Sequence, residues 1–70
     1  MTGAEVLRRI RRTGCSPGPV RQVGSHVRIE CNECRTTVPV HRGQDIPLGT
    51  LRAIERDLEQ CLGRRWLGRR

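Results

Sequence analysis

The sequence predicts an α+β fold, a two-layer α-β-β-β-α sandwich in which both helices pack on one face of a three-stranded antiparallel sheet. Residues 26–31 alternate polar and apolar side chains, which is the pattern of a half-buried strand. A second alternating segment, 34–40, follows after two residues, as in a β-hairpin. Apolar residues three or four positions apart near both ends of the chain indicate two amphipathic helices. Because each helix and the sheet have one apolar face, these faces are expected to pack together.

The first helix is expected to begin after Thr2, because Thr2 and Glu5 have the spacing of a capping box. Its apolar side consists of Val6, Leu7 and Ile10, and its basic side consists of Arg8, Arg9, Arg11 and Arg12. These arginines either bind RNA or are simply solvated. Gly14 is a natural helix end, and the Pro- and Gly-rich residues 15–19 are expected to form a loop.

Three strands are expected, at residues 20–23, 26–31 and 34–40. Gly24 and Ser25 turn the chain between the first two strands, and Asn32 and Glu33 connect the second to the third. Pairing Cys31 with Cys34 sets the register, with Ile29 opposite Thr36, Val27 opposite Val38 and His26 opposite Pro39. The inner face then consists of residues 27, 29, 31, 34, 36, 38 and 40, most of which are Val, Ile or Cys. On the outer face, His41 becomes a diagonal neighbour of His26.

The second helix is predicted from a stripe of apolar residues that covers an arc of roughly 100°. The stripe consists of Leu51, Ile54, Leu58, Cys61 and Leu62. Asp45 or Thr50 is expected to cap this helix, with Pro47 near its first turn and Gly63 at its end. The basic residues 64–70 are a frayed end, a nucleic-acid arm or a partner contact, and fraying is the default expectation.

The composition favours a polyanionic partner. The chain has 14 arginines and no lysine against seven acidic residues, for a net charge of +7. Arginine binds phosphate through a rigid two-pronged guanidinium, which favours nucleic acid, although a solvated basic surface is the alternative. Trp66 is the only aromatic residue apart from histidine, so a base-stacking platform is not expected. RNA binding would then depend on backbone charge and shape.

We expect one domain over residues 1–70, with a core at 2–62 and a basic tail at 63–70. No apolar run approaches the length of a membrane span, and no signal peptide precedes the first helix, so a cytoplasmic protein without a membrane partner is expected. Its four cysteines should then be mostly reduced.

The cysteines also raise a zinc hypothesis, in which Cys31 and Cys34 bind the metal together with Cys15 and Cys61. A single Cys-x-x-Cys pair is a weak sign of zinc. In the alternative that we favour, Cys31 and Cys34 are small apolar residues of the inner face and Cys61 belongs to the helix stripe. We therefore expect no metal, no other cofactor and no Cys31–Cys34 disulfide.

Several short motifs occur in a specific order along the chain. They are Thr2-Gly3 with Glu5, Val20-Arg21-Gln22, Gly24-Ser25-His26, Thr37-Val38-Pro39-Val40-His41, and Gly49-Thr50-Leu51-Arg52 with Ile54. On these residues, from Thr2 to about Leu62, the chain resembles HicA-type toxins, the small mRNA interferases of toxin–antitoxin pairs. The Cys15–Pro19 loop, the Cys-Asn-Glu-Cys hairpin and the longer C-terminal region depart from that pattern.

The resemblance implies a double-stranded-RNA-binding-like fold and an endoribonuclease that cleaves mRNA without the ribosome. It makes His26, the histidine of the Gly-Ser-His motif, the single catalytic residue. It also implies a HicB-like antitoxin that covers the site and inhibits it.

The residues around His26 suit RNA cleavage, because the 2′-hydroxyl of RNA needs only proton transfer and charge stabilisation to attack its own phosphate. Arg21 and Arg28 are candidates for phosphate binding, with Gln22 and Ser25 as hydrogen-bonding support. His41 is a second acid or base, a phosphate contact, or strand-end surface. A non-catalytic RNA- or DNA-binding module fits the charge and fold equally well, and a small zinc-stabilised interaction domain is a third reading.

Overall fold

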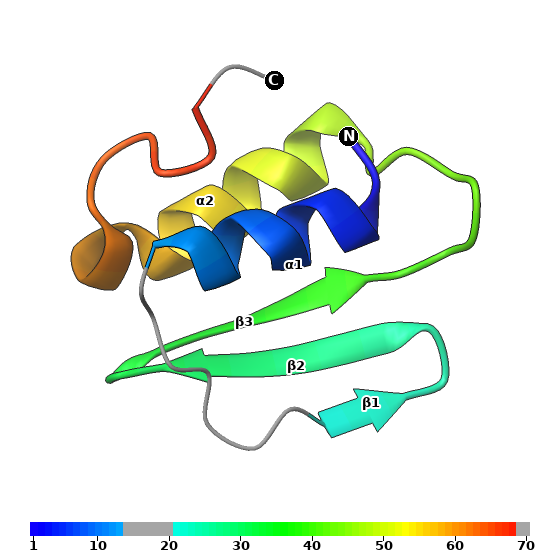
Figure 1. Ribbon diagram of the computed structural model, residues 1–70, viewed down its shortest axis with the longest axis horizontal. Coiled ribbons are helices and arrows are strands. Elements are labelled where there is room, and N and C mark those ends of the chain that lie inside the picture. Colours follow the sequence, from blue (N-terminus) through cyan, green and yellow to red (C-terminus); the bar gives the residue numbers. More distant parts are fainter. Residues whose placement is uncertain (14–20, 69–70) are drawn as a thin grey trace.

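The computed structural model describes residues 1–13 and 21–68 (Figure 1). Its elements are α1 (Gly3–Arg12), β1 (Arg21–Val23), β2 (His26–Cys31), β3 (Cys34–Pro39) and α2 (Leu48–Leu62). The three antiparallel strands lie in the order β1-β2-β3, and both helices lie beside β3 (Figure 1). The predicted α-β-β-β-α sandwich is therefore confirmed. The loop predicted at 15–19, the helix end predicted at Gly14 and the first residue of the predicted first strand fall outside the described residues.

The register of the β2–β3 hairpin is confirmed. Cys31 pairs with Cys34, and the ladder continues to His26 opposite Pro39. Asn32 takes a positive φ of 56° in the two-residue turn, a conformation that asparagine tolerates better than most residues. Buried and exposed residues alternate along both strands, so the apolar set faces the helices and the polar set faces outward.

The first helix begins as expected. The Thr2 hydroxyl accepts a hydrogen bond from the Glu5 backbone N–H at 3.3 Å, which satisfies one of the free donors at the helix start. Gly3 is required there, because a Cβ at this position would collide with the carbonyl oxygen of Pro39 at the end of β3. The close contact between α1 and β3 therefore depends on the absence of a side chain at residue 3.

The start of α2 differs from the prediction. Pro47 occupies the cap position, with no side-chain capping bond, and its carbonyl oxygen accepts the first helical hydrogen bond from Leu51 at 3.0 Å. Thr50 already lies inside the first turn. Asp45 lies two residues too early, and its carboxylate instead pairs with the N-terminal ammonium of Met1 at 3.2 Å. Gly63 ends the helix as predicted, with φ at 95°.

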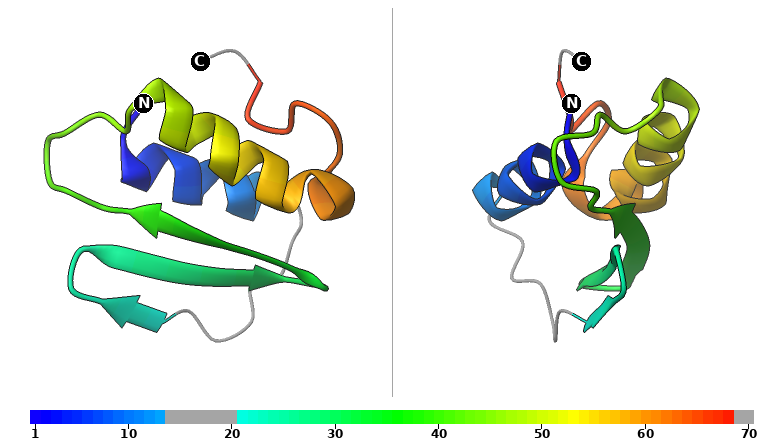
Figure 2. Two further views of the ribbon diagram at one scale, coloured as in Figure 1. Left: turned by 180° about the vertical axis from the view of Figure 1, so that it is seen from behind. Right: turned by 90° about the vertical axis from the view of Figure 1, so that its right-hand side faces the viewer.

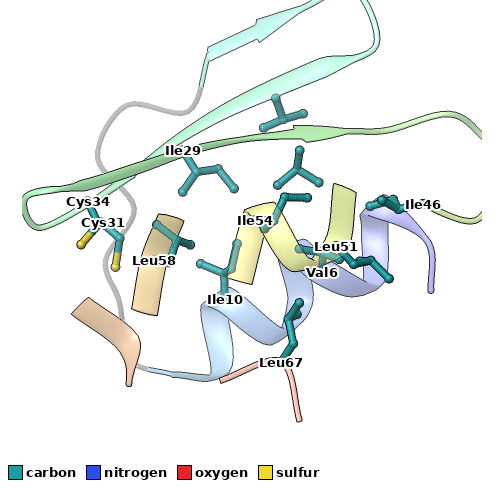
Figure 3. Close-up of a cluster of buried hydrophobic side chains, with 12 residues drawn as sticks. Val6, Ile10, Ile29, Cys31, Cys34, Ile46, Leu51, Ile54, Leu58 and Leu67 are labelled. Atoms are coloured by element: carbon teal, nitrogen blue, oxygen red, sulfur yellow. The ribbon is translucent and has the colours of Figure 1, made fainter. Parts of the chain in front are cut away.

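The hydrophobic core contains residues from both helices, the inner face of the sheet and the tail (Figure 3). Its most buried large side chains are Val6, Ile10, Val38, Ile54, Leu58 and Leu67. Burial of these side chains is the main favourable contribution to folding in so small a chain. None of the described helices is long and apolar enough to cross a membrane.

The expectation that the tail is frayed is wrong for residues 63–68. Leu67 is 0% exposed and belongs to the core, and the guanidinium of Arg9 donates to its carbonyl oxygen. The Trp66 indole N–H donates to the Glu55 carbonyl oxygen of α2 at 2.8 Å. The tail therefore runs back between the two helices and contacts both (Figure 2).

The expectation of reduced cysteines is also wrong. Cys34, the first residue of β3, forms a disulfide with Cys61 near the end of α2, 27 residues away. Their Cα atoms are 6.2 Å apart, within the usual range for a disulfide. Cys31 is disulfide-bonded as well, and Cys15 lies outside the described residues. Two of the four thiolates needed for the zinc hypothesis are thus bonded to each other. The positions of both residues agree with the patterning, which placed Cys34 on the inner face of the sheet and Cys61 on the apolar stripe of the helix.

Candidate active site

Two histidines from different parts of the chain meet at one end of the sheet. His26 is the first residue of β2, and His41 follows β3 by two residues. Their ring centroids are 6.4 Å apart, and the rings meet edge to face at 79°. Both side chains are exposed. The prediction that His41 is a diagonal neighbour of His26 is confirmed.

Backbone contacts hold this pair in place. Gly24 has a φ of 60°, which allows the two-residue turn that brings His26 to the start of β2. The N–H of Val40 donates to the carbonyl oxygen of Ser25 at 2.6 Å. This bond joins the residue before His41 to the residue before His26, so the backbone at both histidines is fixed with few side-chain contacts.

A hollow of about 540 Å³ lies beside the pair. His26, His41 and Thr37 contribute from the sheet and its end, Gln44 and Asp45 from the 41–47 loop, and Thr50 from the first turn of α2. The loop is itself anchored, because the Ile46 N–H donates to the Met1 carbonyl oxygen at 2.8 Å. The hollow therefore combines two imidazoles with several hydrogen-bonding side chains.

A second hollow, of about 420 Å³, continues the first along β3. The two share Thr37 and Thr50, so together they form one groove between the outer side of β3 and α2. Arg28 and Asp57 line the second hollow. We call the joined hollows the β3 groove. The histidine pair lies in its first hollow and Arg28 in its second.

Of the predicted site residues, His26, His41 and Arg28 lie in the β3 groove, whereas Gln22 and Ser25 lie at the turn before His26. Arg28 shares the outer face of β2 with His26 and lines the β3 groove. Gln22 is exposed and its amide donates to the Gly24 carbonyl oxygen at 3.2 Å, so it supports the turn. Ser25 is half-buried in that turn, and its carbonyl oxygen binds Val40. Arg21 pairs with Arg28 across β1 and β2 at the backbone.

Four residues that were not predicted from the sequence also line the hollow beside the histidines: Thr37, Gln44, Asp45 and Thr50. For Thr37, strand alternation places the side chain on the outer face, the same face as His26. This was the only feature of the sequence that could have predicted one of the four. The other three come from the 41–47 loop and the start of α2, which approach the histidines only through tertiary packing.

These features define a small, arginine-rich α+β protein that exposes a histidine pair beside a polar groove. The model of the HicA toxin family of bacterial toxin–antitoxin systems matches residues 3–61, and the chain belongs to that family. Membership implies an antitoxin as partner. No curated protein and no solved structure gives a significant match.

Proposed function

We propose that this chain is an endoribonuclease toxin that cleaves mRNA independently of the ribosome and of metal ions. The observation that carries the proposal is the exposed histidine pair in the β3 groove, with Arg28 in the same groove. Imidazole suits proton transfer near neutral pH, and guanidinium suits phosphate binding. Messenger RNA as the substrate places the protein in the cytoplasm.

In the proposed reaction, His26 accepts the proton of a ribose 2′-hydroxyl as its oxygen attacks the adjacent phosphorus atom. The bond from phosphorus to the 5′-oxygen of the next nucleotide breaks, that oxygen takes a proton from solvent water, and His26 then releases its proton to solvent. The products are a 2′,3′-cyclic phosphate and a 5′-hydroxyl, and no outside nucleophile or metal is consumed. His26 is exposed and needs no rearrangement to meet a substrate.

The surrounding residues bind and orient the phosphate in this proposal. Arg28 lies two residues beyond His26 on the same face of β2, where its guanidinium can neutralise phosphate charge. His41, whose ring centroid lies 6.4 Å from that of His26, contacts the same phosphate. Gln22 and Ser25 support the turn before His26, and Arg21 adds a further charge on the adjacent strand.

The antitoxin in this proposal is a HicB-like protein that covers the β3 groove. An exposed histidine has to be covered if the toxin is to be inhibited without a change in its fold. Covering His26 and His41 together would block both proton transfer and phosphate contact. A non-catalytic RNA- or DNA-binding module would need no cover over the histidines. Coverage of His26 and His41 by the antitoxin would therefore distinguish the endoribonuclease from such a module.

The proposal is tested by incubating the purified protein with a long single-stranded RNA in the presence of EDTA. Fragments that carry 2′,3′-cyclic phosphate and 5′-hydroxyl ends, identified by mass spectrometry, are expected. Binding without fragments would reject the enzyme and favour the non-catalytic module. Cleavage that EDTA abolishes would reject the metal-independent chemistry.

A further inference from the structure

The outer faces of the helices and the tail carry more positive charge than the β3 groove. Three hollows on this side are lined by seven arginines and three glutamates. The arginines are Arg8, Arg9 and Arg12 of α1, Arg52 and Arg56 of α2, and Arg64 and Arg65 of the tail. We call these seven residues the helical arginine surface.

The β3 groove has a different charge balance. Its lining includes two basic residues, Arg28 and Arg35, and three acidic residues, Glu30, Asp45 and Asp57. A polyanion gains most of its affinity from cations that displace its counterions, and these are in excess on the helical side. The groove has the groups for chemistry but little excess charge for holding RNA.

The helical arginine surface is continuous. The hollow on α1 shares Arg9 and Arg12 with a second hollow that reaches Trp66 and Gly68 in the tail. The tail also supplies Arg64 and Arg65 to the third hollow, on α2. The tail backbone passes between α1 and α2 (Figure 2), and its residues line both the hollow that reaches α1 and the hollow on α2.

The tail is fixed in this position. Leu67 is fully buried, and Trp66 donates to the backbone of α2. The arginines beside them therefore extend from an ordered backbone, so less backbone entropy is lost when they bind a ligand than would be lost by a frayed arm.

We propose that the helical arginine surface binds the phosphates of the RNA outside the scissile bond and supplies most of the affinity of the protein for RNA. This rests on the proposed function only in taking RNA as the occupant. A protein partner is disfavoured, because protein interfaces usually have an apolar centre. The large hydrophobic side chains exposed among the described residues, Val23 at 64% and Leu48 at 52%, line none of the three hollows.

The test measures binding of a labelled oligouridine by fluorescence anisotropy over a series of salt concentrations. The full chain carries His26→Ala so that the probe stays intact. Arg52→Gln with Arg56→Gln neutralises two exposed charges of the surface. The control, Asn32→Asp with Arg42→Gln, changes the net charge by the same amount at exposed positions that line neither this surface nor the β3 groove. Circular dichroism and the thermal midpoint verify that both variants fold.

Each lost phosphate contact should reduce the slope of log K against log salt by about 0.7 for a single strand. The Arg52/Arg56 variant is therefore expected to lose roughly 1.4 from the slope and to bind several-fold more weakly at low salt, while the control keeps its slope. Equal slopes for the two variants would overturn the inference. If wild type cleaves RNA but the Arg52/Arg56 variant keeps the parent slope, this inference fails and the proposed function stands. If the His26→Ala parent does not bind the probe and wild type does not cleave RNA, both the inference and the proposed function are rejected.

Discussion

The rings of His26 and His41 meet edge to face with their centroids 6.4 Å apart, although His26 begins β2 and His41 follows β3. A single phosphate between them could contact both imidazoles. His41→Ala is therefore expected to lower kcat/KM for RNA cleavage by roughly 10- to 100-fold, the value of one hydrogen bond to a charged group. Initial rates on a long RNA measure this, with Arg42→Gln as the neighbouring exposed control. If the His41→Ala variant keeps the wild-type kcat/KM, His41 does not contact the phosphate during the reaction.

The buried tail predicts that Leu67 contributes to folding stability. Leu67→Ala leaves a cavity between the helices and should lower the free energy of unfolding by about 2–5 kcal/mol. Urea denaturation measures the change. Val23→Ala, at an exposed position, is the control and should change stability by less than about 0.5 kcal/mol. Equal stability of the two variants would mean that the tail is frayed after all.

The Cys34–Cys61 disulfide closes a loop that includes β3 and α2. Replacing both cysteines by alanine is expected to lower the free energy of unfolding by about 3–4 kcal/mol, because the unfolded chain regains the freedom of that loop. The change is read from the denaturation midpoint. Alkylation of the native wild-type protein supplies the check: rapid labelling of Cys34 or Cys61 would contradict the bond.

Gly3 and Gly49 form a matched pair of helical glycines. A Cβ at Gly3 would collide with the backbone of β3, whereas a Cβ at Gly49 would meet open space. Gly3→Ala is expected to destabilise the protein by about 1–3 kcal/mol through the forced separation of α1 from β3. Gly49→Ala should be neutral or stabilising by up to about 1 kcal/mol. Thermal denaturation compares the two, and the opposite order would refute the close approach.

The sequence was sufficient to predict the sheet, because alternation fixes which face each residue occupies. A shift of one residue would have exposed Val27 and Ile29, so the register and the approach of His41 to His26 followed from the pattern. Thr2 and Gly63 likewise carried local signals for helix ends. These features depend on neighbours in the sequence.

Features that depend on tertiary packing could not be predicted in this way. Leu67 and its neighbour Trp66 stand alone in a stretch of arginine and glycine that is too short for a periodic pattern, so nothing local indicated the burial of Leu67. The pairing of Cys34 with Cys61 depends on how α2 lies against β3. Gln44 and Asp45 lie beside the histidines because Met1 anchors the 41–47 loop, through its carbonyl oxygen to the Ile46 N–H and through its ammonium to Asp45. The same packing produces the helical arginine surface.

The proposed catalytic role of His26 is tested most directly by comparing wild type, His26→Ala and Glu33→Ala on a long single-stranded RNA with EDTA present, because Glu33 is exposed and lies outside the β3 groove. His26 is exposed, so its replacement should leave the fold intact. Wild type and Glu33→Ala are expected to give fragments with 2′,3′-cyclic phosphate ends, and His26→Ala to give none while still binding RNA. Cleavage by His26→Ala at the wild-type rate would contradict the account and place the chemistry elsewhere.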